Sequence, residues 1–369
     1  MHRLFKKLRL TAIISIALCL VLICSGCGKA KTDSGKNAPS EALGRDYLVI
    51  PMTTGEKSPI AACSYDLLNT VCTIQLYDST DYDILNGCFE VIDHYEKIFS
   101  RTLEGSEVYN INHSNKTSFL ISDELKELLE LALTYCSISN GALDISIAPL
   151  STLWDFSNLE HKTTAPSDKD ILDALEKVDY SGIRLEGNRL TFAKPGMQLE
   201  FGAIAKGFIA DKVKEYLLAN DVQSAIINLG GNILLVGEKP DGAAFQVGIQ
   251  KPFEDRDAVV VAISSLKDVS MVSSGIYERY FYDKNGTFYH HILNPETGYP
   301  CDADILQVTI ISPTSAAGDA LSTACFALGL EKGMALIDSL EDVYAVFVAA
   351  DGTLYFSDGY LETIPTRTE

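Results

Sequence analysis

The sequence predicts a single compact α+β domain, either undivided or two-lobed, in which mixed sheets are flanked by helices. From residue 64 onward, segments with apolar residues at helical spacing alternate with short strand-like segments. Hydrophobic residues make up 47% of the 369-residue chain, which supplies a sizeable core and rules out a disordered protein. No repeat or linker interrupts residues 64–360, so one domain is expected there.

Local signals predict the elements of the N-terminal half. Short runs of β-favouring residues predict strands, and apolar residues at helical spacing predict helices. Serine side chains that can accept hydrogen bonds from free first-turn amides mark two helix starts. The expected elements are strands at 47–50 and 71–77, a helix at 82–99, a helix that begins after Ser122 and ends at Asn140-Gly141, and a short helix opened by Ser167 with Asp170.

The same signals continue through the C-terminal half, where glycine-rich turns separate the strands. Asp351-Gly352 tolerates the positive φ angles of a tight turn and so predicts a closing hairpin. The expected elements are helices at 205–219 and 315–328 and strands at 224–229, 233–236, 245–250, 259–263, 306–312, 343–349 and 353–356.

The N-terminal residues have a different composition and predict an export signal. Four basic residues precede an almost continuously apolar run at 10–23, which is too short to span a bilayer comfortably. The following Ser-Gly-Cys resembles a bacterial lipobox with Cys27 as the lipidated residue; an ordinary cleaved signal is the alternative. The expected organisation is a signal peptide at 1–26, a flexible tether at 27–46, a globular functional domain at 47–362 and a tail at 363–369.

The basic start, the apolar run and the lipobox-like sequence predict a protein anchored to the cell membrane by lipid and facing outside the cytoplasm.

The formal net charge of −20 argues against nucleic acid as a partner, because phosphate backbones would be repelled. It does not exclude a small phosphate ligand held by local positive charge. Six cysteines follow the tether without a CxxC pair, so a zinc knuckle is not expected, and disulfides and buried thiols both remain open.

The first motif with chemical potential is the segment 200–207, Glu-Phe-Gly-Ala-Ile-Ala-Lys-Gly, where a strand gives way to a helix. Free amides at a helix start and the nearby Lys206 ammonium suit a phosphate group. The sequence is not a Walker loop, because the ending GK[ST] is absent. An ordinary surface turn with an exposed lysine explains the same residues.

The second motif is the segment 318–324, Gly-Asp-Ala-Leu-Ser-Thr-Ala, in a helical stretch. Asp319 and Thr323 are four residues apart and therefore share one helix face. A carboxylate and a hydroxyl suit Mg²⁺, whose remaining ligands are often waters and substrate phosphates. A helix-start aspartate stabilised by the helix dipole is the alternative.

The third motif is the segment 290–298, His-His-Ile-Leu-Asn-Pro-Glu-Thr-Gly. A histidine just before a loop can serve as a proton acceptor, although a purely structural turn fits equally well. Glycines at 230–231 and several aromatic residues could flank a planar ligand or simply form turns and core.

Together the motifs occur in one order: GALD with a following PL and W, EFGAIAKG, NLGGN, SSGIYER, HILNPETG and GDALSTA. This series resembles the ApbE family, the FAD:protein FMN transferases, over roughly residues 64–357. HxxxPxTG followed by DAxSTA is its specific part. The resemblance implies Mg²⁺-dependent transfer of FMN from FAD to a Ser or Thr hydroxyl of a target protein, with release of AMP.

The resemblance also implies the site residues. Asp319 and the Thr323 hydroxyl would bind the metal, with the carbonyl oxygens of Ala203 and Ser322. Either His291 or Asp319 would accept the proton of the attacking hydroxyl. Glu200 stands where the family usually has Asp, Leu68 where many members have Met, and Thr102 where an aromatic residue is common. The implied FAD-contacting residues are Leu68, Thr102, Ala142, Leu143, Asp144, Glu200, Lys206, His291 and Ile292.

The implied partners are FAD and flavin-acceptor proteins of membrane or exported redox systems, including subunits of ion-pumping NADH:quinone-type complexes. Two other functions remain open from the sequence. A Mg²⁺-dependent FAD pyrophosphatase would use the same site with water as the acceptor. A lipoprotein that only binds flavin or another solute would not need the metal-binding helix.

Overall fold

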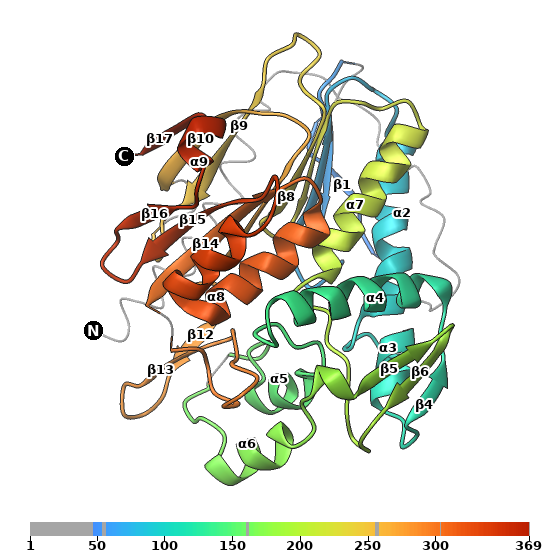
Figure 1. The fold of residues 1–369 in the computed structure, drawn as a ribbon. Coiled ribbons are helices and arrows are strands. Elements are labelled where there is room, and N and C mark those ends of the chain that lie inside the picture. Colours follow the sequence, from blue (N-terminus) through green and yellow to red (C-terminus); the bar gives the residue numbers. More distant parts are fainter. Residues whose placement is uncertain (1–46, 54–56, 160–161, 255–257, 303, 369) are drawn as a thin grey trace, which may run out of the picture. The chain divides into compact units, whose positions relative to one another are not determined.

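The computed structural model describes residues 47–53, 57–159, 162–254, 258–302 and 304–368. The described residues belong to one compact unit, Asp46–Glu369 (Figure 1). The predicted signal peptide, Cys27 and the tether lie outside the described residues.

The centre of the fold is a nine-stranded sheet in which every pair of neighbouring strands runs antiparallel. Apolar side chains on both faces of its inner strands are buried, which explains why helices cover one face and a second sheet covers the other. Its strands in spatial order are β1 (Ile50–Pro51), β2 (Ile60–Ser64), β3 (Cys72–Leu76), β7 (Ala225–Leu229), β8 (Asn232–Val236), β11 (Ser270–Gly275), β14 (Ile305–Ser312), β15 (Tyr344–Ala349) and β16 (Leu354–Phe356).

Three long helices cover one face of this sheet: α2 (Tyr82–Phe99), α7 (Ala205–Ala219) and α8 (Ser315–Asp338) (Figure 1). The other face packs against a three-stranded sheet and a short helix, and its core includes Phe245, Met271 and Tyr360. These elements are β9 (Phe245–Gln250), β10 (Val259–Leu266), β17 (Thr366–Thr368) and α9 (Tyr360–Thr363).

The remaining elements lie near one end of the large sheet (Figure 1). A separate apolar cluster is built around Trp154, whose indole nitrogen donates to the carbonyl of Gly298 at 2.8 Å. These elements are α3 (Glu107–Asn112), β4 (Ser118–Leu120), α4 (Asp123–Ile138), α5 (Ala148–Trp154), α6 (Asp168–Leu175), a 3₁₀ helix (Tyr180–Gly182), β5 (Ile183–Glu186), β6 (Arg189–Phe192), and the hairpin β12 (Tyr280–Tyr282) with β13 (Phe288–His290).

The predicted α+β class is confirmed, and so are the bounds of the helices at 82–99 and 205–219. Ser122 and Ser167 cap their helices as expected, each accepting a hydrogen bond from the amide three residues later. The expected strand at 47–50 is wrong, because pairing with β2 begins only at Ile50. The closing hairpin is confirmed as β15 and β16, and the predicted tail contains β17, which pairs with β10.

Helix α8 is longer than predicted and bends at Gly329. The φ of this residue is 77°, a conformation that glycine adopts readily because it has no side chain. Its length and composition would also suit a membrane span, but it packs against β14 and α7 as a core helix.

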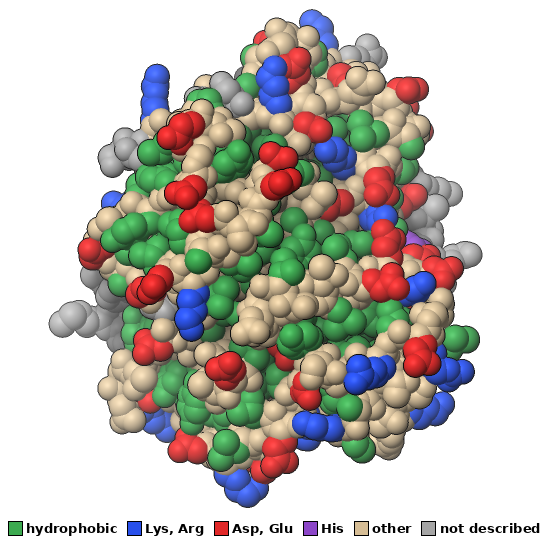
Figure 2. Space-filling view, viewed as in Figure 1, with side chains coloured by type: hydrophobic (Ala, Val, Ile, Leu, Met, Phe, Trp, Pro, Cys, Tyr) green, Lys and Arg blue, Asp and Glu red, His purple; other side chains and the backbone are tan. Residues whose placement is uncertain are grey.

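The six cysteines of the described domain are buried free thiols. On the face in Figure 2, Lys and Arg side chains stand among Asp and Glu, and apolar side chains gather over α8 and α4.

Candidate functional site

Helices α7 and α8 approach each other closely at their N-terminal turns, which brings the second motif against the first. A Cβ atom added to Gly207 would lie 2.1 Å from the carbonyl oxygen of Ser315, so only glycine fits there. This explains why glycine follows Lys206 in the sequence. The close approach places Asp319 of α8 beside the first turn of α7.

Asp319 is almost fully buried and is held by groups at the start of α7. Its Oδ2 accepts the amide hydrogen of Gly207 at 3.0 Å, and the Lys206 ammonium lies 3.3 Å from its Oδ1. The Lys206 Nζ also donates to the carbonyl oxygen of Gly202 at 2.9 Å. A carboxylate and a carbonyl oxygen therefore converge on one cation at the start of α7.

Hydroxyl groups extend this polar cluster along α8. The hydroxyl groups of Ser322 and Ser274 are 2.8 Å apart, and that of Thr323 lies 3.5 Å from Ser274. Ser322 and Thr323 also donate to the carbonyl oxygen of Asp319, at 2.9 and 3.5 Å. The residues of the second motif and the end of β11 thus form one hydroxyl-rich face.

His291 lies just after the β12–β13 hairpin, and its Nδ1 is 3.3 Å from the carbonyl oxygen of Arg279. A carbonyl can only accept, so Nδ1 carries the proton and Nε2 carries the lone pair. Burial, followed by the positive charges of Arg279, His290 and Lys206, lowers the pKa of His291 to about 3. The ring is therefore neutral at physiological pH.

His290 has a structural environment instead. It is buried, its Nε2 lies 2.9 Å from the carbonyl oxygen of Cys301, and its ring packs against Phe326 of α8. Burial lowers the pKa of His290 as well. Of the two adjacent histidines, only His291 has a ring nitrogen with a lone pair at a half-buried position beside the charged cluster.

Glu200 is joined to two other predicted FAD-contacting residues by a chain of contacts. Its carboxylate forms an ion pair with Arg101, which also donates to Thr152 at 3.3 Å. Thr102, the next residue, accepts a hydrogen bond from Asn69 at 3.4 Å, and Asn69 follows Leu68. Leu68 and Asn69 both have positive φ, so this loop adopts an uncommon backbone conformation.

The predicted segment Ala142, Leu143 and Asp144 forms a tight turn beside Glu200, whose amide donates to the carbonyl of Ile145 at 2.8 Å. The Asp144 carboxylate accepts from the amide and hydroxyl of Ser146 and from the amide of Tyr180. Leu143 is buried in the main core, so its side chain is not available to a ligand. The side chain of Ile292 is likewise buried in the cluster around α8.

The oxygen atoms beside the starts of α7 and α8 could bind Mg²⁺, although the protein would supply few of its ligands. No group of three His, Cys, Asp or Glu side chains suited to a metal occurs among the described residues. The acceptors that surround the Lys206 ammonium are all oxygens, which are the ligands that Mg²⁺ prefers. If Mg²⁺ bound here, one carboxylate with carbonyl and hydroxyl oxygens would leave its remaining positions to phosphates and water.

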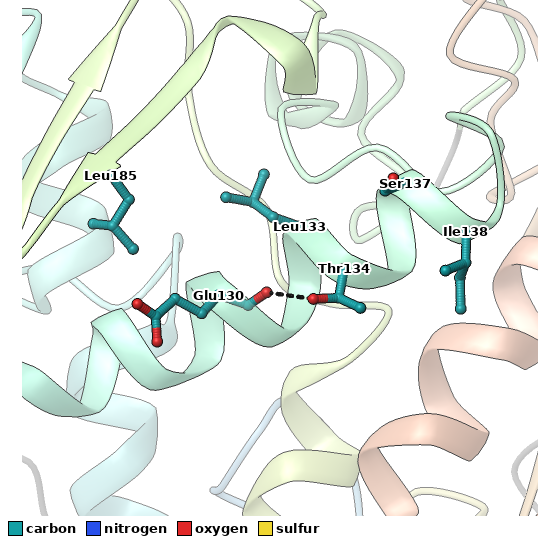
Figure 3. Close-up of a pocket in the computed structure, with 6 residues that line it drawn as sticks. All are labelled: Glu130, Leu133, Thr134, Ser137, Ile138 and Leu185. Atoms are coloured by element: carbon teal, nitrogen blue, oxygen red, sulfur yellow. Dashed lines mark hydrogen bonds between the residues drawn. The ribbon is translucent and has the colours of Figure 1, made fainter.

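Two surface hollows occur elsewhere in the described residues. One, of about 500 Å³, lies between α4 and β5, with Leu133, Ile138 and Leu185 in its wall (Figure 3). The other, of about 460 Å³, is lined by Thr152 of α5, Asp170 of α6 and Gln198. The second adjoins the Arg101 contact through Thr152, whereas the first contains none of the predicted site residues.

Sequence reasoning missed four residues at this site: Arg101, Asp211, Ser274 and Arg279. Ser274 and Arg279 belong to the SSGIYER motif, so their positions were signalled but not their roles. Asp211 accepts the amide hydrogens of Ser315 and Ala316 at 2.8 and 2.9 Å. No local pattern indicates that contact, because its partners are more than one hundred residues away.

A profile described as the ApbE family matches residues 68–347 of the chain. An FAD:protein FMN transferase of Klebsiella pneumoniae (strain 342) is 34% identical over 294 residues, which is 79% of this chain and 90% of that protein. Another from Treponema pallidum (strain Nichols) is 34% identical over 321 residues, which is 81% and 87% of the two chains.

Solved structures show the same similarity in the fold. The structure of the ApbE protein from Thermotoga maritima is 26% identical and superposes with a TM-score of 0.72, covering 86% of this chain and 99% of that one. The flavin transferase ApbE from Vibrio cholerae is 22% identical, also with a TM-score of 0.72 and the same coverage, and shows the likeness of fold alone.

Proposed function

Since the chain belongs to the ApbE family of FAD:protein FMN transferases, we propose that it moves FMN from FAD to a Ser or Thr hydroxyl of a target protein, requires Mg²⁺ and releases AMP. The enzyme is a transferase, and FAD is its flavin substrate. One observation carries the proposal of Mg²⁺-dependent transfer. The Asp319 carboxylate and the Gly202 carbonyl together bind a cation, the Lys206 ammonium, at the start of α7; we call this group of three the cation-binding corner.

Phosphoryl-type transfer depends on positioning and on neutralising the charge of the phosphates. The acidic chain presents a lysine ammonium at the start of α7, where the helix dipole also favours an anion. Mg²⁺ would be held by Asp319, the Thr323 hydroxyl and the carbonyl oxygens of Ala203 and Ser322, and would neutralise pyrophosphate charge when bound. Lys206 would then turn from Asp319 toward a phosphate.

The transfer step balances with one proton acceptor. The oxygen of the target hydroxyl attacks the phosphorus on the FMN side of the pyrophosphate, and the phosphorus–oxygen bond to AMP breaks. AMP leaves with the electron pair of that bond, and the hydroxyl proton passes to the enzyme. We assign this proton to Nε2 of His291, because Asp319 accepts the Gly207 amide and would hold Mg²⁺ in the proposed reaction.

The FAD contacts remain a proposal. Four of the implied FAD-contacting residues, Leu68, Thr102, Ala142 and Asp144, belong to segments that are joined to Glu200 by contacts. We propose that these segments form a rim around Glu200 along which the flavin nucleotide would lie. The buried side chains of Leu143 and Ile292 leave only their backbone groups for such contacts. Arg101 joins this rim as an additional cation beside Glu200.

We further propose that the enzyme works outside the cytoplasm, anchored through Cys27. The basic start, the short apolar run and the Ser-Gly-Cys sequence support this location. Its acceptors would then be membrane or exported redox proteins. Radiolabelled palmitate incorporation into the full chain, compared with a Cys27→Ser variant, tests the anchor; equal labelling of both would contradict it.

The decisive experiment incubates the purified chain with FAD, MgCl₂ and a subunit of a membrane NADH:quinone-type complex as the acceptor. A second acceptor with its reactive Ser or Thr replaced by Ala is the matched control. We expect covalent flavin fluorescence on the first acceptor only, AMP release in equal amount, and no reaction with EDTA. Free FMN without covalent fluorescence would identify a pyrophosphatase, and bound FAD without turnover a flavin-binding protein.

A further inference from the structure

We propose that Asp211 is a positioning residue that fixes Asp319 against the start of α7. The inference rests on the proposed function for its kinetic readout, but not for its structural one. Asp211 lies on the second turn of α7 and accepts hydrogen bonds from the first two amides of α8, those of Ser315 and Ala316. Among the described residues, the hydrogen bonds of the Asp211 side chain go to these two backbone amides and to no predicted ligand-binding group.

The two helices cap each other. Asp211 of α7 binds the amides that open α8, and Asp319 of α8 binds the Gly207 amide in the first turn of α7. First-turn amides have no partner within their own helix, so each carboxylate satisfies donors that would otherwise be unpaired. Each carboxylate also meets the positive end of the other helix dipole.

Other contacts at the start of α8 do not replace Asp211. Within the described part of the chain, the Thr314 side chain accepts one hydrogen bond, from the amide of Ala317 at 3.4 Å. The Ser315 hydroxyl donates to Oδ1 of Asn232 and so leaves its own amide to Asp211. Ser315 and Ala316 are both buried, which keeps water from taking over the two amides.

The close approach at Gly207 leaves no slack between the helices. Because the Ser315 carbonyl occupies the space next to Gly207, α8 cannot shift toward α7, and Asp211 prevents its first turn from shifting away. Asp319 lies one turn after Ser315 on the same helix, so the start of α8 and the Asp319 carboxylate move together. Asp211 thus determines where Asp319 meets Lys206.

Charged groups around Asp211 shape the choice of variant. Lys214 and Glu215 lie near it on α7, and burial raises the pKa of Asp211 against the effect of its two amide hydrogen bonds. Asp211→Asn keeps the shape of the side chain but leaves one amide without an oxygen acceptor. Asp211→Glu restores the carboxylate, and Glu215→Gln removes an exposed acid one turn later as the matched control.

The first readout is hydrogen exchange of the Gly207 amide in the full chain, without ligands. We expect exchange about 10-fold faster in Asp211→Asn, intermediate exchange in Asp211→Glu, and no change in Glu215→Gln. A Gly207 amide as well protected in Asp211→Asn as in the wild type would overturn the inference. This result does not depend on whether the protein transfers FMN.

The second readout titrates MgCl₂ against melting temperature without FAD, and the third measures transfer kinetics. Loss of a group that orients a metal ligand typically costs about 10- to 100-fold in metal affinity or activity. We expect such an increase in the MgCl₂ midpoint of Asp211→Asn, with a matching fall in kcat and a KM for FAD within about threefold. A lower melting temperature with unchanged midpoint and kcat would reduce Asp211 to a structural residue and overturn the inference.

Failure of the proposed function would look different. The wild type would then transfer no FMN, while its Gly207 amide would still respond to Asp211→Asn. Inference and function therefore fail separately: the first on exchange at Gly207, the second on covalent flavin in the acceptor.

Discussion

Two buried aspartates, Asp319 and Asp144, were both predicted to contact ligands, but they lie in different electrostatic surroundings. Asp319 is 4% exposed and faces a lysine ammonium and one amide. Asp144 is 7% exposed and faces three neutral donors from Ser146 and Tyr180. The difference is that Asp319 has a charged side chain, the Lys206 ammonium, among its partners, whereas Asp144 has only two backbone amides and one hydroxyl group.

From this difference we expect the two residues to act differently: Asp319 toward a metal, and Asp144 by holding the turn beside Glu200 in place. The Lys206 side chain is 28% exposed, and in the proposed reaction it would leave Asp319 for a phosphate when Mg²⁺ binds. The hydrogen bonds of Asp144 close the turn between Ala142 and Ser146 and bind it to Tyr180. Motif matching treats both residues alike, because both occur in the shared series of motifs.

The largest expected effect is that of Asp319→Ala. Without its carboxylate, the corner keeps no negative side chain for a metal, and the Lys206 ammonium loses its partner. We expect transfer to fall by about 1,000-fold or more and the effect of Mg²⁺ on the melting temperature to disappear. A variant with full Mg²⁺-dependent activity in the covalent fluorescence assay would remove Asp319 from the metal site.

His291→Ala tests whether His291 accepts the proton of the attacking hydroxyl. We expect transfer to fall by about 100-fold or more, with FAD affinity, measured by flavin fluorescence, retained. The pKa of about 3 keeps His291 neutral in the native state, so the wild-type rate should show no step near pH 6.5 from this residue. Unchanged flavinylation in the variant would exclude His291 as the proton acceptor.

The same pKa determines how His291 affects stability. The unfolded histidine gains a proton as the pH falls below its usual pKa of 6.5, but the native one does not until about pH 3. The free energy of unfolding should therefore decrease as the pH falls between these values. His291→Ala should flatten this part of the stability curve, which urea titrations at several pH values can measure.

Asp144→Asn has the smallest expected effect on the reaction. We expect kcat within about twofold of the wild type but a loss of about 1–3 kcal/mol in the free energy of unfolding, because a buried amide loses its acceptor. A large fall in kcat with unchanged stability would place Asp144 in the ligand site and end the contrast with Asp319.

Asp144 also has a pH signature with its own sign. Burial raises the pKa of Asp144 above its usual 3.8, so the native state retains a proton that the unfolded state has lost. The free energy of unfolding should fall as the pH rises from 3.8 through the native pKa. Asp144→Asn, which cannot titrate, should remove this contribution in urea titrations.

The predictable part of the fold was the part with local signals. Helix 82–99 has a one-sided apolar pattern and an aspartate cap, and helix 205–219 was predicted with the same bounds as observed. Strand β11 gave no such signal. It is a central strand, but it contains the adjacent polar residues Ser273 and Ser274, which interrupt the apolar pattern expected of such a strand. Their hydroxyl groups are satisfied by Thr309 and Ser322 from distant parts of the chain. The half-buried positions of these two serines can be recognised only once these neighbours are in place.

The sequence alone determined which chemical groups the protein carries and in what order, including the resemblance that led to the ApbE family. The tertiary structure decided which of these groups face one another. Gly207 and Asp319 are 112 residues apart, and their contact depends on how closely two helices approach. Apolar spacing and capping act within a few residues, whereas the placing of a carboxylate beside an ammonium requires the whole packed core.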